Sequence, residues 1–197
     1  MTTGKAVRLV FKLSMAHYHQ KPVLPSLKNF RACAIVATLA SSLLSVNAAH
    51  ASPRVVVLDV ELTGDLGGPA FSSQHQARLE MASARLRENL QRSDLYQVLD
   101  NARAQESIDR LSGQHLYLHN CGECALEIGR ELGADRVLVS WVFRVSALIL
   151  TLNYEMIDVS TGQITARKSF DFRGDNDVAW TRAIDYMVRD MKSEGAK

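Results

Sequence analysis

The sequence has 197 residues, of which 47% are hydrophobic and 22% charged, and its 23 basic and 21 acidic side chains give a formal net charge of +2. The first 51 residues hold six of the basic side chains and no acidic one, so residues 52–197 carry 17 basic against 21 acidic side chains, a net charge of −4. A mildly acidic domain without a basic run lacks the charge pattern by which proteins bind nucleic acid or anionic lipid. We therefore exclude nucleic acid as a partner.

The first 51 residues have the organisation of an export leader. Lys28 and Arg31 precede the apolar run 32–46, and the small-x-small sequence at residues 49–51 follows it as a cleavage signal. The run spans about 15 residues, whereas a membrane-spanning helix needs about 20. We therefore expect a periplasmic protein whose leader is cleaved near Ala51 and whose mature chain has no stable membrane span.

Two further features of the leader decide how the chain is divided. Met15 offers a second start besides Met1, because the stretch before the apolar run is unusually long for a leader. Cys33 stands at the front of the apolar run, whereas a lipid-modified cysteine would close it, so we do not expect a lipoprotein. The remaining residues 52–197 suit a single domain, since no repeat or low-complexity linker divides them.

The mature chain begins with a strand–helix–strand pattern. Residues 54–62 are rich in valine and leucine and predict a buried strand, which the glycine-rich loop 63–69 closes. Apolar side chains recur at helical spacing over residues 73–93, and a short strand pattern follows at residues 96–99. This order is typical of a parallel crossover unit.

Two helices are predicted in the middle of the chain. Asp100 or Asn101 can cap the first of them, which carries an apolar stripe up to Gly113. Residues 125–132 predict the second, shorter helix, and Gly133 stops it before the next strand.

The rest of the chain predicts an antiparallel meander followed by a helix. Strand patterns occupy residues 136–145, 148–156 and 164–172. A turn at residues 160–162 joins the last two strands as a hairpin. The link at residues 146–147 lacks glycine and asparagine, so it is either a turn or a bend within one strand. The final helix begins near Asp177.

Together these elements predict an α/β fold in a single domain. A mixed five-stranded sheet, with a parallel β-α-β part followed by an antiparallel meander, is covered by helices. If the link at residues 146–147 is a turn, the last strand runs parallel to the first, and their carboxyl ends share the edge where open α/β sheets bind ligands. We therefore predict a binding rim formed by Asp65, Asp100, Asn101, Arg173, Asp175, Asp177 and Trp180.

The C-x-x-C motif of Cys121 and Cys124 opens the short third helix and is compatible with three chemistries. An oxidising compartment favours a local disulfide. In a redox centre Cys121 would be activated at a helix N-terminus, although thioredoxin-type enzymes need a later cis-proline and no proline follows Pro69. His115 and His119 complete a four-ligand set that zinc or copper could use, although so short a segment strains a tetrahedron.

The remaining polar groups give weaker indications. Asp65, Asp175 and Asp177, with Asn176, offer oxygen ligands for a cation, but residues 175–177 also stand where they would cap the last helix, which we prefer. The sequence contains no G-x-G-x-x-G, P-loop lysine or G-x-S-x-G motif. We therefore assign no catalytic residues and expect no cofactor other than a metal at the cysteine motif.

Several motifs in the sequence carry a family resemblance. The leader is followed by characteristic segments at residues 57–62, 121–124, 132–135, 145–150, 158–162 and 173–180. With these segments the chain resembles an uncharacterised family of secreted proteobacterial proteins, a domain of unknown function, across essentially the whole mature chain. This resemblance implies no catalytic residues.

A more distant resemblance rests on the strand–helix–strand order and on Leu132-Gly133-Ala134-Asp135 entering a strand. These features are similar to the amino-terminal domain of TolB and to the CsgG-type secretion lipoproteins, which implies a periplasmic binding or assembly module. Some relatives are associated with quinoprotein alcohol dehydrogenase systems, which implies a periplasmic protein partner of that kind.

The function that these observations favour is a non-catalytic periplasmic binding or accessory module for a protein complex or small ligand. In this interpretation Cys121 and Cys124 form a stabilising disulfide beside the rim. The alternative is a periplasmic thiol–disulfide or metal-handling protein that acts through the same two cysteines.

Overall fold

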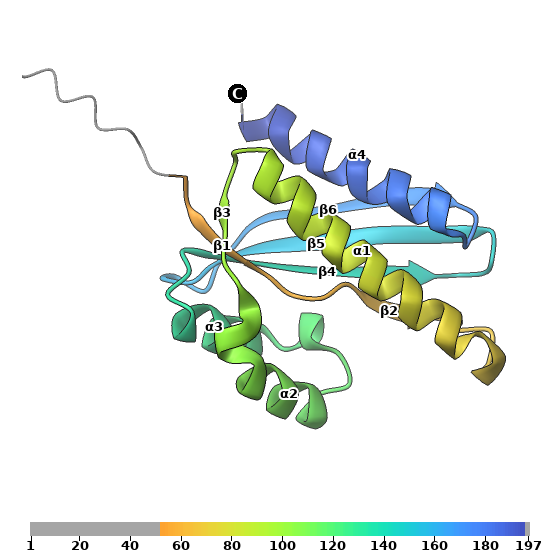
Figure 1. The fold of residues 1–197 in the computed structure, drawn as a ribbon, viewed down its shortest axis with the longest axis horizontal. Helices are drawn as coiled ribbons and strands as arrows, with labels where there is room; N and C mark the ends of the chain where they lie inside the picture. The colour runs from red at the N-terminus through yellow and green to blue at the C-terminus, as the bar shows by residue number, and fades with distance from the viewer. Residues whose placement is uncertain (1–51, 196–197) are drawn as a thin grey trace, which may run out of the picture. The chain divides into compact units, whose positions relative to one another are not determined.

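The computed structural model describes residues 52–195, which form one α/β domain (Figure 1). The predicted fold class is confirmed, with six strands in a mixed sheet in place of the predicted five. The predicted leader, with Cys33 and the cleavage position near Ala51, lies outside the described residues. Among the helices that are described, none is both long enough and apolar enough to cross a membrane.

Six strands, four α-helices and three short 3-10 helices make up the described chain. In sequence order they are β1 (Arg54–Val57), β2 (Glu61–Gly64), η1 (Pro69–Phe71), α1 (Ser72–Arg92), β3 (Gln97–Val98), η2 (Asn101–Ala104), α2 (Gln105–Gln114), η3 (Leu118–Asn120), α3 (Gly122–Glu131), β4 (Arg136–Arg144), β5 (Ile149–Asp158), β6 (Ile164–Arg173) and α4 (Asp177–Gly195).

The sheet has the strand order β3-β1-β4-β5-β6, and β2 pairs with the far half of β4. β1 runs parallel to β3 and β4, whereas β4, β5 and β6 are successively antiparallel, so β6 runs parallel to β1. The link at residues 146–147 is a true turn, because the N–H groups of Val145 and Ser146 donate to the carbonyl of Ile149. The predicted meander is therefore confirmed.

The single strand predicted over residues 54–62 is interrupted by a bulge, which separates β1 from β2. Val57 pairs with Leu138 and Glu61 pairs with Trp141, so four steps along one strand oppose three along the other. An extra residue of this kind reverses the alternation of side chains between the two faces. Val57 and Leu62 consequently enter the same core although their parities differ.

Groups from α1 and η2 satisfy the backbone polar atoms that the bulge leaves without strand partners. The N–H of Val60 donates to Ser83 Oγ at 2.9 Å, and the carbonyl of Val57 accepts from Asn101 Nδ2 at 2.9 Å and from Arg87 Nη2 at 3.0 Å. A buried backbone group without a partner would cost as much as a lost hydrogen bond. These side chains therefore stabilise the break in the strand.

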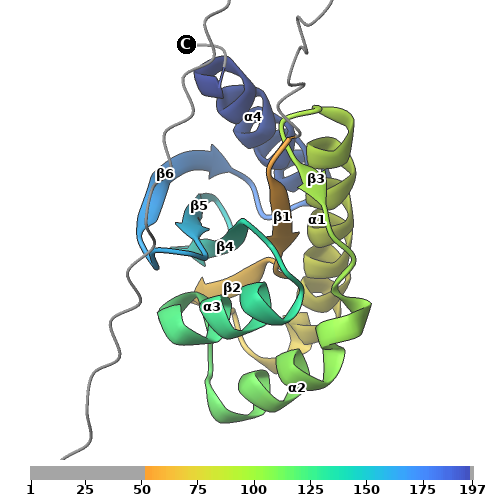
Figure 2. The same cartoon turned by 90° about the vertical axis from the view of Figure 1, so that its left-hand side faces the viewer.

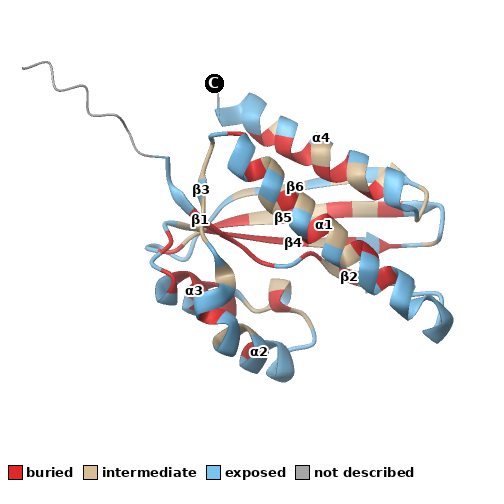
Figure 3. Ribbon diagram, viewed as in Figure 1, coloured by how far each residue is buried: buried red, intermediate tan, exposed pale blue. Residues whose placement is uncertain are grey.

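Helices cover the two faces of the sheet unequally (Figures 1 and 2). On one face, α1 and α4 lie side by side along the strands; Ala82, Leu86 and Leu90 follow one stripe of α1 and are fully buried there. On the other face, α2 and α3 cover the end of the sheet near β1 and β3, and parts of both helices are buried (Figure 3). Ile128 of α3 is fully buried there. Over the remainder of that second face, the described part of the chain places no α-helix, and the short helix η3 lies against β2 and β4.

Candidate functional site

Three loops meet at the end of the sheet where β2 and β6 finish. The loop after β2 is held by the N–H of Asp65, which donates to the carbonyl of Arg144 at 2.8 Å. The loop after β6 is held by the N–H of Asp175, which donates to the carbonyl of Ala147 at 2.9 Å. The β4–β5 turn thus lies between the other two loops, and we call the three loops together the rim.

A glycine permits the close approach of β2 to β4 at the rim. Gly64 has φ +91°, and a Cβ built on it would lie 2.3 Å from the carbonyl oxygen of Arg144. Any other residue at position 64 would be strained, because the backbone there is left-handed and a Cβ would clash with this carbonyl oxygen.

A buried ionic cluster lies beneath the rim and joins α1, β4 and α4. Asp175 is its centre: Arg78 Nη1 donates to Oδ1 at 2.8 Å and Arg144 Nε donates to Oδ2 at 2.8 Å. The indole N–H of Trp180 donates to Oδ1 at 3.1 Å, and Nε2 of His75 lies 3.3 Å from Oδ2. The side chains of both arginines and of Asp175 are buried.

The protonation state of Asp175 follows from these contacts. Burial raises its pKa, but the hydrogen bonds from Arg144 and Trp180 and the positive charge of Arg78 outweigh burial, so the pKa lies below its ordinary value. The carboxylate therefore stays ionised at neutral pH and balances part of the charge of the two buried arginines.

The structure gives the predicted rim residues of the last loop different roles from those expected. The cap of α4 is Asn176, whose Oδ1 accepts from the N–H of Ala179 at 3.1 Å, whereas Asp175 points into the ionic cluster. Asp177 accepts from Arg78 Nε at 2.9 Å, and Asp65 lies 3.5 Å from Arg144 Nη1. The carboxylates considered as cation ligands thus already contact two guanidinium groups.

Exposed apolar side chains are concentrated at the rim. Ten large hydrophobic side chains are exposed in the described chain, and seven belong to the rim loops or to the ends of the elements that they join. These seven are Leu66, Phe71, Phe143, Val145, Leu148, Ile149 and Val178. Sequence reasoning missed them, because the tertiary structure decides whether an apolar side chain in a loop or at the end of an element is buried.

Two residues of the predicted rim lie elsewhere. Asp100 caps η2 by accepting from the N–H of Ala102, and Asn101 binds the carbonyl of Val57. Both line a separate groove of about 370 Å³, where β1 and β3 end. β2 extends the sheet beyond that point, so the predicted edge is divided into two places. Asp65, Arg173, Asp175, Asp177 and Trp180 belong to the far end.

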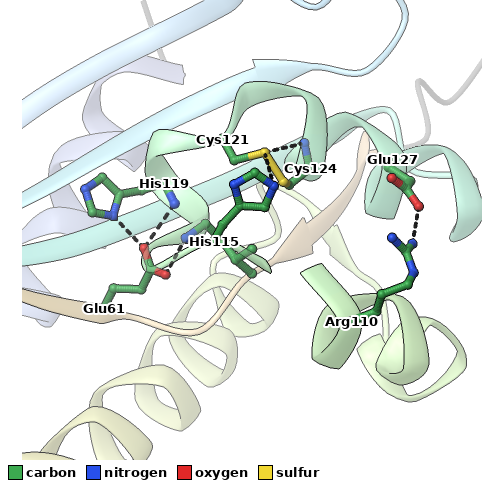
Figure 4. The surroundings of a disulfide bond; sticks show 8 residues. Glu61, Arg110, His115, His119, Cys121, Cys124 and Glu127 are labelled. Carbon is green, nitrogen blue, oxygen red and sulfur yellow. Dashed lines mark hydrogen bonds and ion pairs between the residues drawn. A yellow bond between two sulfur atoms is a disulfide. The ribbon is translucent and has the colours of Figure 1, made fainter. Parts of the chain in front are cut away.

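The cysteine motif lies at the start of α3 (Figure 4), and α3 lies on the face of the sheet opposite α1 and α4 (Figure 1). The sulfur atoms of Cys121 and Cys124 are 1.95 Å apart, which supports the predicted disulfide. Cys121 Sγ accepts from the N–H of Cys124 at 3.3 Å, and Nε2 of His115 lies 3.7 Å from the same sulfur. One histidine and both cysteines of the predicted ligand set therefore lie together.

His119, the fourth predicted ligand, is held apart from the cysteines. Its Nδ1 lies 2.5 Å from Glu61 Oε2, and its ring stacks on Trp141 at 4.4 Å between centroids. Glu61 also accepts from the N–H groups of Leu118 and His119, as Figure 4 shows. Glu61 thereby anchors η3. This role could not be predicted from local pattern, because the bulge before β2 decides toward which face Glu61 points.

The family comparison covers most of the chain. A family model described as "Protein of unknown function (DUF2380)", with the name DUF3280, matches residues 53–191. The chain belongs to the DUF3280 family. The predicted membership of a domain family of unknown function is thereby confirmed. No curated protein matches this DUF3280 chain.

Several solved structures are similar to the DUF3280 chain at low identity. The LpoB C-terminal domain from Escherichia coli is 18% identical with a TM-score of 0.43, over 68% of this chain and 92% of that domain. Lipoprotein GNA1162 from Neisseria meningitidis is 15% identical with a TM-score of 0.43, over 74% and 97%. TolB from Acinetobacter baumannii is 12% identical with a TM-score of 0.44, over 73% and 29%.

Proposed function

We propose that this DUF3280 protein is an exported, non-catalytic accessory module that binds a protein partner through its rim. The observation that carries the proposal is the concentration of exposed apolar side chains at the rim, with Leu148 70% exposed at the β4–β5 turn. Exposed apolar side chains that gather in one region of a domain are typical of an interaction site.

The ionic cluster beneath the rim supports this proposal. Asp175 binds side chains from α1, β4 and α4, and its backbone binds the β4–β5 turn. These contacts hold the three loops in one arrangement before any partner arrives. A surface that is ordered in advance loses less conformational entropy on binding, so more of its contact energy appears as affinity.

Exposed polar groups border the apolar side chains of the rim. Asp65 and Asp177 are 63% and 78% exposed, and each lies beside a buried arginine, Arg144 and Arg78 respectively. A polar border around an apolar centre is typical of a protein interface.

Site-specific photo-crosslinking in the native envelope tests the rim. A crosslinkable residue at position 148 should capture a discrete partner. In a second experiment the crosslinker stands at a neighbouring rim position, and Leu148→Asp should then abolish the capture of that partner. Leu116→Asp is the matched control, since Leu116 is 87% exposed but lies between α2 and η3. Equal capture by both variants would contradict the proposal.

A second candidate function is thiol–disulfide exchange at Cys121. Cys124 is only 2% exposed, whereas Cys121 is partly accessible, lies at the start of α3 and has a histidine nitrogen 3.7 Å from its sulfur. A helix N-terminus and a neighbouring imidazolium both stabilise a thiolate. After reduction, His115 and the two thiolates would also offer three ligands to zinc or copper.

Quantitative alkylation of protein taken directly from the envelope separates the two functions. An exchange centre should contain a measurable reduced fraction, and His115→Ala should slow the alkylation of Cys121 after mild reduction. A pair that is fully bonded and resistant to mild reductant contradicts the second candidate.

The quinoprotein system stays a prediction from the resemblance; none of the comparisons supports it.

A further inference from the structure

The outer edge of β6 has no strand partner among residues 52–195. β6 stands at the end of the strand order and pairs with β5 alone. Its ten residues therefore present backbone N–H and C=O groups along their outer side, beside α4 (Figure 2). An open edge of this length is a template for the addition of another strand.

A groove of about 470 Å³ runs between β6 and α4. Its base is apolar: the ring of Phe170 on β6 meets the ring of Tyr186 on α4 edge-on, at 5.4 Å between centroids. Lys168 also joins β6 to α4, because its Nζ binds Asp190 at 2.6 Å. The residues that line the groove include Arg173, which lies at the rim.

Basic side chains outnumber acidic ones at this groove. Arg173 and Arg182 line it together with Asp171, and Arg189 lies beside it, 5.9 Å over the ring of Tyr186. Within the described part of the chain, none of the three arginines has a carboxylate oxygen within 4.0 Å. The acidic residues on the same stretch of α4 are already paired, Asp185 with Arg85 and Asp190 with Lys168.

We propose that an extended acidic segment of the protein partner adds to the outer edge of β6 and places alternate side chains in the groove between β6 and α4. This inference rests on the proposed function only in taking a protein as the partner. The strand edge supplies backbone hydrogen bonds, Phe170 and Tyr186 supply apolar contact, and the three arginines supply charge complementarity.

Charge argues against two other occupants of the edge. The chain's own residues 1–51 hold six basic side chains and no acidic one, so they would be repelled by the groove. A second copy would bring its own Arg173 and Arg182 to the same edge, so two grooves of like charge would meet there.

Peptide binding to the exported, purified protein tests the proposal. The probe is a fluorescein-labelled Ser-Glu-Val-Glu-Val-Glu-Ser amide, measured by fluorescence anisotropy, and the same peptide with lysine in place of glutamate is its charge control. We expect the acidic probe alone to bind. N-methylation of every second peptide nitrogen along one edge should abolish binding, whereas methylation along the other edge should leave it intact. Equal effects of the two methylation patterns would overturn strand addition.

Two charge-reversal variants locate the binding. Arg182→Glu should weaken the acidic probe by about tenfold or more, since it replaces attraction by repulsion at the groove. Arg130→Glu makes the same change on exposed α3 and should leave the affinity within about twofold, because screening suppresses distant surface charges. Equal losses in both variants would overturn the proposal.

The remaining outcomes separate this inference from the rim. Leu148→Asp should leave peptide binding unchanged, because Leu148 does not line the groove. A failure of the rim to capture a partner would therefore contradict the proposed function without affecting the peptide result. A protein that captures a partner through the rim but ignores the acidic probe overturns the strand addition alone. Two other results would also overturn it. One is a protein that does not bind the peptide but sediments with phosphatidylglycerol vesicles in a way that depends on Arg182. The other is a dimer that depends on Arg182, detected by sedimentation equilibrium.

Discussion

Arg144 donates from Nε to Oδ2 of Asp175 at 2.8 Å, and the side chains of both residues are less than a tenth exposed. The bond joins the end of β4 to the loop before α4, and Arg144 Nη1 also donates to the carbonyl of Asp65 in the third rim loop. One buried ion pair therefore sets the relative positions of all three loops at the rim.

Removing the charge of Asp175 should destabilise the fold strongly. Asp175→Asn leaves Arg78 and Arg144 buried without their shared carboxylate, and breaking a buried pair in this way costs about 3 kcal/mol or more. Asp135→Asn is the control, because Asp135 pairs with Arg54 at the exposed surface and its loss should change stability little. Urea denaturation measures both; similar midpoints for the two variants would contradict the role of the cluster.

Stability should fall at acid pH because of the same carboxylate. The pKa of Asp175 in the folded protein lies below its ordinary value of 3.8. As the pH falls, the carboxylate of Asp175 is therefore protonated in the unfolded chain before it is protonated in the folded protein. Its contribution is therefore complete above about pH 4 and is lost as the pH falls through the folded-state pKa. Urea melts over this range should show a smaller loss in Asp175→Asn than in the natural protein; parallel curves would show that other carboxylates dominate.

The bulge between β1 and β2 should depend on Ser83. Its hydroxyl is the acceptor for the buried N–H of Val60. Ser83→Ala leaves that N–H without a partner, which should lower the free energy of unfolding by about 1–3 kcal/mol. Ser112→Ala, on the exposed side of α2, should change it by less than about 0.5 kcal/mol. Unfolding free energies that are equal for the two variants would contradict this account.

Gly129 should be required where α3 packs on the sheet. A Cβ at this position would lie 2.6 Å from Val137 Cγ2 and 2.8 Å from Val159 Cγ2. Gly129→Ala should therefore destabilise by about 1–3 kcal/mol through overpacking. Gly113→Ala is the matched control within α2, because nothing lies within 4 Å of the added Cβ, and it should stabilise by about 0.5–1 kcal/mol. Thermal unfolding of the two variants should shift in opposite directions.

The bond between Cys121 and Cys124 should contribute modestly to stability. It closes a very short loop, for which the chain-entropy model gives about 2 kcal/mol. Cys121→Ser with Cys124→Ala removes the bond but keeps an oxygen that can accept from the N–H of residue 124. We expect a lower melting temperature with partner capture intact at permissive temperature. An unchanged melting temperature would show that the bond is not structural.

Local pattern was sufficient for most elements of this fold, although not for the break between β1 and β2. The stripe of Ala82, Leu86 and Leu90 predicts α1, and the alternation along residues 148–156 predicts β5, because each periodicity is a property of neighbouring residues alone. The same reasoning places Asp65, Arg173, Asp175 and Trp180 at one end of the sheet once the strand directions are known.

What the sequence determined by itself is therefore the fold class, the order of the helices and of most strands, and the position of the C-x-x-C motif at the start of a helix, all of which follow from short-range spacing. The tertiary structure decided the bulge after Val57 and the partners of Asp175. Arg78 and Asp175 are 97 residues apart, and their bond exists because the packing of α1 beside α4 brings them together. The division of the predicted rim into two places also depends on tertiary structure. β2 pairs with β4 and carries the sheet beyond the end of β1, and the extent of this pairing cannot be seen in local pattern.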